Sequence, residues 1–200
     1  MLDAYHLAWA DEIVDALYAL ARENPDRPPS VRALATKLTE CVPRSSQILN
    51  EGEVYYLKGL WRITYRTGLP IERLSVVLGH ELGHWWFKRF DLTPPPRPIE
   101  EALCDAIGAR LAAPKIPFTA ALEAFDHRVH ALAKQFRTTQ TVSLLRICEL
   151  AGRPGMAKKR GEGWIARGGE FEWAEDWREI PRVKAHYVKV DDRWGMLATR

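Results

Sequence analysis

The chain has few cysteines and no long hydrophobic segment. Its three cysteines, Cys41, Cys104 and Cys148, lie far apart in 200 residues. Such a sparse, odd set argues against a disulfide scaffold and favours a reducing compartment, so we expect a cytoplasmic protein. No run of about eighteen apolar residues occurs, which argues against a membrane-spanning helix and a membrane partner. Acidic residues interrupt the first apolar stretch, so we expect no signal peptide there.

The sequence also lacks an internal repeat and a strong net charge. Apolar residues make up 46% and charged residues 28%, which is typical of a globular protein and excludes a disordered or fibrous chain. The formal net charge is +3, although residues 126–200 carry an excess of +5. That excess is more often a solvated surface than a docking site for an acidic partner. A short basic stretch, 158–160, lies near Trp164, but it is too short to favour nucleic-acid binding.

Hydrophobic periodicity predicts helices along most of the chain. The predicted helices span residues 2–23, 31–40, 71–88, 99–112, 119–136 and 139–150. Ser30 is a suitable N-cap for the second of them. Prolines and glycines separate these segments and indicate loops between them.

Strands are predicted in two places. Residues 53–57 and 60–65 are rich in β-branched and aromatic residues and flank Lys58-Gly59, which predicts an antiparallel hairpin. Residues 43–50, just before the hairpin, are expected to form a loop. Residues 183–190 alternate in polarity like a strand. The fold class predicted from these patterns is therefore α+β.

Residues 80–84 form an HExxH motif, His80-Glu81-Leu82-Gly83-His84, inside the predicted helix 71–88. Residues four apart lie on nearly the same side of a helix, so both imidazoles can bind one ion. Glu81 lies on the same side and can reach a water on that ion as a general base. The motif therefore predicts a Zn²⁺ site with His80 and His84 as ligands and Glu81 as the catalytic residue. The alternative is a chance match, with two partly buried histidines hydrogen-bonded to their surroundings.

A third ligand follows at a suitable distance along the chain. Glu101 shares a face of the helix 99–112 with Asp105, Gly108 and Ala112. Small residues on that face allow a close approach to the HExxH helix. We therefore predict Glu101 as the third ligand. Asp105 is predicted to accept a hydrogen bond from the outer nitrogen of a ligand histidine.

Glu100 is the alternative to Glu101 as third ligand. It lies at the start of the helix 99–112 and off the face that carries Glu101. A carboxylate in a first helical turn is stabilised by the helix dipole without any ligand. Glu100 is therefore expected to be a solvated acid.

These motifs resemble those of the ImmA/IrrE family of zinc metallopeptidases. The HExxH motif is followed by Glu101-x-x-Cys104-Asp105-Ala106-Ile107-Gly108-Ala109-x-Leu111-x-x-Pro114, which is similar to the family's second motif. A weaker similarity to the family's later helices involves Leu132, Ala133, Phe136, Ser143, Arg146 and Gly152. The resemblance covers residues 1–152 and implies a metallopeptidase domain there. Residues 153–163 would then form a basic, flexible linker and residues 164–200 a Trp-rich, β-rich appendage.

The resemblance implies a helical, zincin-like (gluzincin-like) core with a small antiparallel sheet. It also implies a phage- or mobile-element-linked regulatory protease whose protein substrate is a helix-turn-helix repressor. Two other classes remain open. One is a metal-binding regulator that docks a repressor without cleaving it, and the other is a nucleic-acid-binding protein with a structural zinc. Glu81 favours the peptidase, because a structural site needs no base.

Other residues carry weaker signals. His127 and His130 are spaced for a second site but are expected to be surface residues. Cys104 occupies a small apolar position and is expected in the core. The group that stabilises the oxyanion is not identified by any pattern. Weak candidates are His127, His130, His186 and Tyr65.

Overall fold

The computed structural model describes residues 2, 4–125, 128–151, 155–159, 163–167, 185–190 and 193–198, with side chains up to residue 150. The chain divides into two compact units. The first unit comprises residues 1–118 and 136–138, and the second comprises residues 119–135 and 139–200. Across the described ranges the chain is an α+β protein rich in helix, as expected. The predicted division at residue 152 stays a prediction.

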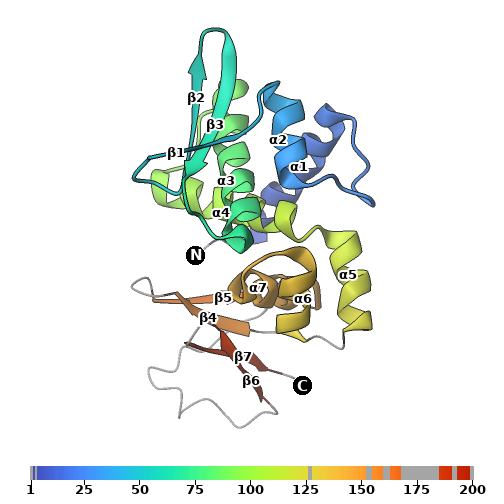
Figure 1. Cartoon of the computed structure of the whole chain (residues 1–200). Coiled ribbons are helices and arrows are strands. Elements are labelled where there is room, and N and C mark those ends of the chain that lie inside the picture. Colours follow the sequence, from blue (N-terminus) through green and yellow to red (C-terminus); the bar gives the residue numbers. More distant parts are fainter. Residues whose placement is uncertain are drawn as a thin grey trace. The chain divides into compact units, whose positions relative to one another are not determined.

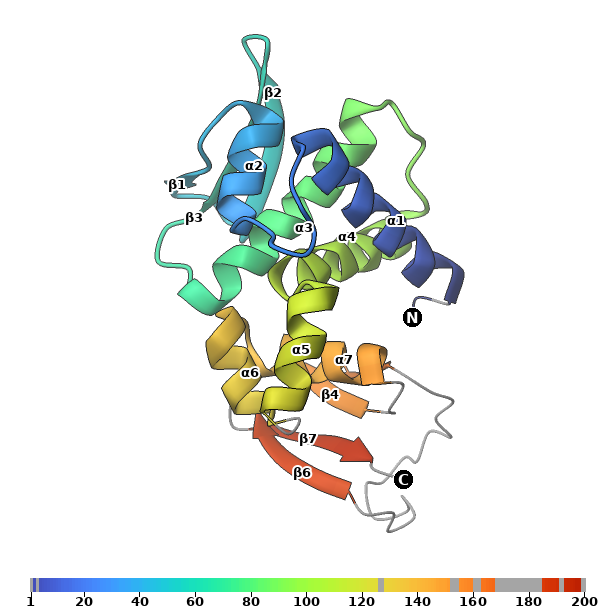
Figure 2. The same ribbon diagram turned by 90° about the vertical axis from the view of Figure 1, so that its right-hand side faces the viewer.

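Four helices and a small sheet build the first unit (Figure 1). The helices are α1 (Ala4–Ala21), α2 (Val31–Thr39), α3 (Ile71–Arg89) and α4 (Arg97–Ala112). Helix α3 packs against α4, α2 and the sheet, and α1 packs against α4 and α2 (Figure 2). The Ser30 side chain caps α2 by accepting a hydrogen bond from the Ala33 amide, as predicted. All four helices lie within a few residues of their predicted ranges.

The sheet has three strands in the order β1-β3-β2. The predicted hairpin is confirmed, with β2 (Gly52–Leu57) antiparallel to β3 (Leu60–Arg66). Its turn places both Lys58 and Gly59 at positive φ, 52° and 81°, which matches the twist of the strands.

The prediction of an antiparallel sheet with a loop at 43–50 is wrong in one respect. Strand β1 (Arg44–Ser46) pairs in parallel with β3, so the sheet is mixed. The sequence Arg-Ser-Ser carries no strand signal of its own. These residues follow α2 in the chain, and the position of that helix places them beside the free edge of β3. The pairing is therefore decided by tertiary packing.

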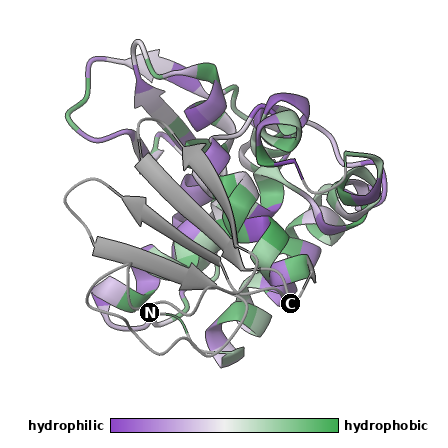
Figure 3. Ribbon diagram, turned by 90° about the horizontal axis from the view of Figure 1, so that it is seen from below, coloured by the Kyte–Doolittle hydropathy of each residue, from purple (hydrophilic) through white to green (hydrophobic). Residues whose placement is uncertain are grey.

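The core of the first unit is closed by a tight crossing of α3 and α4. A Cβ at Gly108 would lie 2.5 Å from the Val76 carbonyl oxygen and 2.9 Å from the His80 nitrogen. Because these are backbone atoms, only glycine allows the two helices to come this close. The close approach predicted from the small residues of α4 is confirmed. Figure 3 shows both hydrophobic and hydrophilic residues on the helices, as expected of helices that each bury one side.

The predicted helix 119–136 is wrong. The structure has α5 (Lys115–Ala124) and α6 (Val129–Phe136) with a break between them. Phe118 and Phe136 lie in contact, with ring centroids 4.9 Å apart. One straight helix would separate them by roughly 27 Å, at about 1.5 Å per residue. Burial of these rings therefore favours the break over a continuous helix.

In its described residues the second unit continues with α7 (Gln140–Ala151) and four strands. These are β4 (Gly155–Lys159), β5 (Gly163–Arg167), β6 (Ala185–Val190) and β7 (Arg193–Ala198). They pair antiparallel in the order β5-β4-β7-β6. Strand β4 falls where the linker was expected, and β6 falls within the predicted strand 183–190. Trp173 and Trp177 lie outside the described residues.

Candidate metal centre

The HExxH motif lies near the middle of α3, where the helix is anchored by its apolar side. Leu78 and Leu82 are fully buried and Trp85 is almost so. His80 and His84 project from an adjacent side of the helix, each less than one fifth exposed. The local sequence thus places both imidazoles at the edge of the core, as the motif predicts.

Helix α4 brings Glu101 to the two histidines. His80 Nε2 lies 3.1 Å from His84 Nε2, and Glu101 Oε2 lies 3.4 Å and 3.7 Å from those two nitrogens. The other oxygen of Glu101 faces Arg97, with Oε1 3.7 Å from Nε. In the described part of the chain, these three residues are the group able to hold a metal ion.

The outer nitrogens of both histidines bind carboxylates. His80 Nδ1 lies 2.9 Å from Asp105 Oδ1, and His84 Nδ1 lies 2.8 Å from Glu100 Oε1. An ionised carboxylate only accepts hydrogen bonds, so each Nδ1 must carry a hydrogen and donate it. Each neutral imidazole then presents a bare lone pair at Nε2. Two nitrogen lone pairs and a carboxylate oxygen thus point at one another with no donor between them.

Three acceptors this close repel unless a positive charge, either a proton or a metal ion, lies among them. Burial lowers the pKa of His80, but the hydrogen bond and charge of Asp105, with nearby Glu81 and Glu101, outweigh it and raise that pKa. Burial and the charge of His80 lower the pKa of His84, despite its bond to Glu100. The neighbouring acids therefore favour one positive charge within the cluster.

The expectation for Glu100 is wrong. Its side chain is only 17% exposed, against 43% for Glu101, and it accepts the hydrogen bond from His84. It is therefore a partner of the cluster and no solvated acid. This role could have been expected, because each metal-binding histidine usually donates its outer N–H to an acceptor such as a carboxylate. The phase of α4 against α3, which decides the pairing, is not readable from the sequence.

Asp105 lies where the prediction placed it, in hydrogen-bond contact with an outer histidine nitrogen. The two carboxylates thus divide the histidines between them, Asp105 on His80 and Glu100 on His84. Each bond fixes both the tautomer and the ring orientation of its histidine. Their effect on metal affinity stays a prediction.

Glu81 is a buried acid beside the cluster. It is 6% exposed, and burial raises its pKa to about 7 against the lowering effect of His80 and Lys88. Strand β2 covers it closely, because a Cβ at Gly52 would lie 2.7 Å from Glu81 Oε1. A carboxyl group with a pKa near neutrality can both accept and return a proton.

Cys104 lies in the core, as expected. It is fully buried, and its Sγ lies 3.6 Å from His84 Nδ1. Burial, with the charges of Glu100 and Glu101, raises the pKa of the thiol well above its ordinary value. The thiol therefore stays protonated at neutral pH and packs against His84.

The other weak candidates are not brought to the cluster by any described contact. Tyr65 is half-buried and packs against the core of the first unit. His130 is exposed on α6, in the second unit. His127 lies outside the described residues, as do Arg160 and the side chains of His186, Lys158, Lys159 and Trp164.

Comparison with known protein families and with curated proteins finds no match for this chain. Of the helices described, none combines the length and the apolar character needed to cross a membrane.

The distances between the three possible ligand atoms can be compared with those around a metal ion. A tetrahedral ion with bonds of about 2.0–2.1 Å has ligand atoms roughly 3.3–3.4 Å apart. The three observed separations, 3.1, 3.4 and 3.7 Å, bracket that value. Two imidazoles with one carboxylate form a donor set typical of a transition metal. The residues present therefore fit such an ion.

Proposed function

We propose that this protein is a zinc-dependent metallopeptidase that hydrolyses a peptide bond in a protein substrate. His80, His84 and Glu101 would hold Zn²⁺ and leave one position for a further ligand. The observation that carries the proposal is the convergence of three acceptor atoms, backed by two carboxylates that fix the histidine tautomers.

The donor atoms favour a transition metal over magnesium or calcium, and zinc is the metal that the HExxH motif predicts. Imidazole nitrogen with one carboxylate oxygen suits zinc, whereas magnesium and calcium prefer oxygen alone. A structural zinc site has four protein ligands. The described chain offers three in this group. A three-ligand set is typical of a catalytic site.

The reaction would divide between the ion and Glu81. Bound zinc supplies Lewis-acid chemistry, polarising a peptide carbonyl and making water more acidic. Glu81 would take the proton of the attacking water and return it to the leaving amine. Burial raises the pKa of Glu81, which makes its carboxylate a stronger base than an exposed one. Glu100 and Asp105 would keep the imidazoles in the tautomer that binds metal.

The substrate class is taken from the resemblance to ImmA/IrrE peptidases. By that resemblance the substrate is a helix-turn-helix repressor, cleaved in a phage- or mobile-element-linked regulatory response in the cytoplasm. Residues 80–84 and 101–114 support the resemblance through their motifs. The helix that carries the motif packs against both the small sheet and the ligand helix, which supports the zincin-like core that the resemblance implies.

The test is cleavage of a peptide library prepared from a whole proteome, with products identified by mass spectrometry. The protein loaded with one equivalent of Zn²⁺ should cut the library at a restricted set of sites. Chelation should abolish the cuts and zinc should restore them. Cleavage that resists chelation would contradict the proposal.

Glu81→Gln is the matched variant, because it keeps the shape of the side chain and removes the base. It should bind one zinc per chain, keep its melting temperature within a few degrees and lose at least 10²–10⁴-fold in cleavage rate. Glu72→Gln, a change at an exposed acid of the same helix, is the control and should keep full activity. If Glu81→Gln retains a biological effect that His80→Ala loses, the protein docks a partner without cleaving it.

A further inference from the structure

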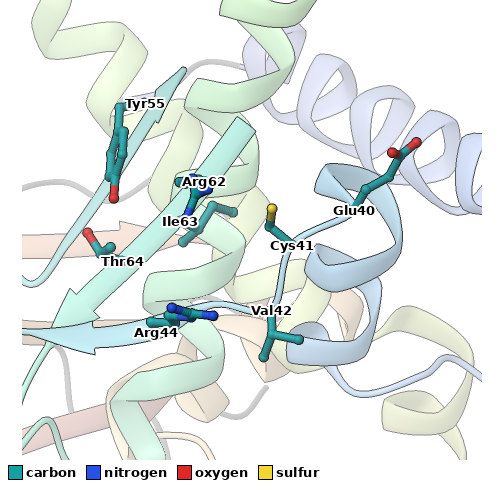
Figure 4. A pocket seen from close by; sticks show the side chains of 8 residues that line it. All are labelled: Glu40, Cys41, Val42, Arg44, Tyr55, Arg62, Ile63 and Thr64. Atoms are coloured by element: carbon teal, nitrogen blue, oxygen red, sulfur yellow. The ribbon is translucent and has the colours of Figure 1, made fainter. Parts of the chain in front are cut away.

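A hollow of about 240 Å³ lies on the sheet of the first unit and shares no residue with the metal centre (Figure 4). We call it the arginine hollow, after Arg44 and Arg62, which line it together with Tyr55 and Thr64. The α2–β1 connection closes one side of it with Val42. It is smaller than a site for a drug-sized ligand, which typically measures about 300–1,000 Å³.

The strand register gathers its four polar side chains on one face. Arg44 of β1 lies opposite Thr64 of β3, and Tyr55 of β2 lies opposite Arg62 of β3. Arg62 and Thr64 are two residues apart, so they share a face of the strand. Between them, Ile63 points to the other face and is buried in the core. This cluster depends on β1, whose parallel pairing the sequence does not predict.

The positive charges in the hollow are not neutralised by the described chain. Arg66 and Arg73 form ion pairs with Glu51, and Arg110 does so with Asp11. In contrast, neither Arg44 nor Arg62 has an ion pair or a side-chain hydrogen bond to any described residue.

Two acids lie near the hollow, but neither forms an ion pair with its arginines. Glu53 lies opposite Thr64 and shares its face, but no ion pair joins it to Arg44 or Arg62 in the described ranges. Glu40 lines the hollow, but its carboxylate points away from the arginines (Figure 4). Both guanidinium groups therefore lack a direct carboxylate partner among the described residues.

Buried donor groups in the hollow also lack partners. The Nε of Arg62 and the Oγ1 of Thr64 are shielded from solvent, and neither has a hydrogen-bond partner in the described chain. A buried polar group without a partner costs free energy, so each such group calls for an explanation. A ligand oxygen would satisfy both, once the long side chain of Arg62 turns toward it.

We propose that the arginine hollow binds a small phosphate monoester through its doubly charged phosphate group. Two guanidinium groups match two negative charges and bind phosphate oxygens with their paired donors. The hydroxyls of Thr64 and Tyr55 add two further donors. Val42 offers an apolar contact for the group that carries the phosphate. The proposal is independent of the metal centre.

The test is the binding of inorganic phosphate to metal-free protein, measured by calorimetry at constant ionic strength. Arg62→Gln and Arg44→Gln should each weaken binding about tenfold or more, the effect of losing a charge-assisted hydrogen bond. Arg27→Gln, which removes a charge from an exposed loop, is the control and should bind as tightly as the parent. His80→Ala should also bind normally, which separates this site from the metal centre.

Thr64→Val provides a second readout that a structural role would not produce. Valine has the shape of threonine without the hydroxyl, so removal of an unpartnered buried group should leave the melting temperature unchanged or raise it. The same variant should bind phosphate more weakly. A lower melting temperature for Thr64→Val would overturn the proposal. So would equal phosphate binding by parent, Arg62→Gln and Arg44→Gln, or acetate binding as tight as that of phosphate.

Discussion

The two polar clusters of the first unit lack opposite kinds of hydrogen-bonding group. The metal centre brings together three atoms, from His80, His84 and Glu101, that are all hydrogen-bond acceptors when both histidines are neutral. The arginine hollow brings together two donor groups, Arg62 Nε and the Thr64 hydroxyl, that have no hydrogen-bond partner in the described chain. An excess of acceptors favours a cation, and an excess of donors favours an anion. The hydrogen-bond inventory of a site thus indicates the sign of its ligand before the ligand is known.

The clusters also differ in how they are held. Carboxylates on α4 fix both histidine rings, so the metal centre is preorganised. Arg44 and Arg62 have no comparable partner in the described chain and depend on strand register alone. Side chains that are already fixed in their binding geometry lose little entropy when a ligand binds. We therefore expect the metal centre to bind its ligand much more tightly than the hollow does.

The largest effect is expected from removing one imidazole. His80→Ala and His84→Ala should each abolish stoichiometric zinc binding, because two ligands hold zinc poorly. Elemental analysis of purified protein measures this directly, with Arg62→Gln as the control that keeps the metal. Full zinc content in both histidine variants would break the assignment of the cluster as a cation site.

Substitutions of Glu101 and Glu100 should differ in how much zinc affinity they remove. Glu101→Gln removes a ligand and should reduce zinc affinity far more than Glu100→Gln, which removes only the partner of His84. For Glu100→Gln we expect a loss of about 10–100-fold, the usual effect of an outer-shell partner. Competition with a chromophoric chelator measures both affinities. If Glu100→Gln has the larger effect, the two acids have exchanged roles.

Asp105→Asn should weaken zinc binding about tenfold, at the lower end of the usual effect of losing such a partner. Its carboxylate is 63% exposed, so solvent can replace part of its interaction with His80. Lys115→Gln, another change at an exposed position, should leave the affinity unchanged. An Asp105→Asn variant with parental affinity would show that the ring of His80 is held by packing alone.

Gly108→Ala should lower the free energy of unfolding by about 1–3 kcal/mol, because the new methyl group meets backbone atoms of α3. Metal affinity should fall as well, since α3 and α4 carry the ligands. Gly59→Ala has open space but a φ of 81°, so it should cost about 1 kcal/mol without changing metal affinity. Chemical denaturation together with metal titration separates the two effects. A Gly108→Ala variant with parental metal affinity would indicate that the helices separate without moving the ligands.

The sequence by itself determined the local features of this protein. The spacing of His80 and His84 places both rings on one side of α3, since that geometry is complete within a single helical turn. The Lys58-Gly59 turn likewise predicts the hairpin from two adjacent residues. Helix ends marked by Ser30 and the proline-rich loops follow from short-range rules about caps and breaks.

Only the tertiary structure decided which distant residues meet. The pairing of Glu100 with His84 depends on the phase and depth of α4 against α3, which the Gly108 crossing sets. The break between α5 and α6 follows from the contact of Phe118 with Phe136. The arginine hollow exists because β1 joins the sheet in parallel. In each case the deciding free energy comes from packing between segments far apart in the chain, and no local pattern of residues encodes that packing.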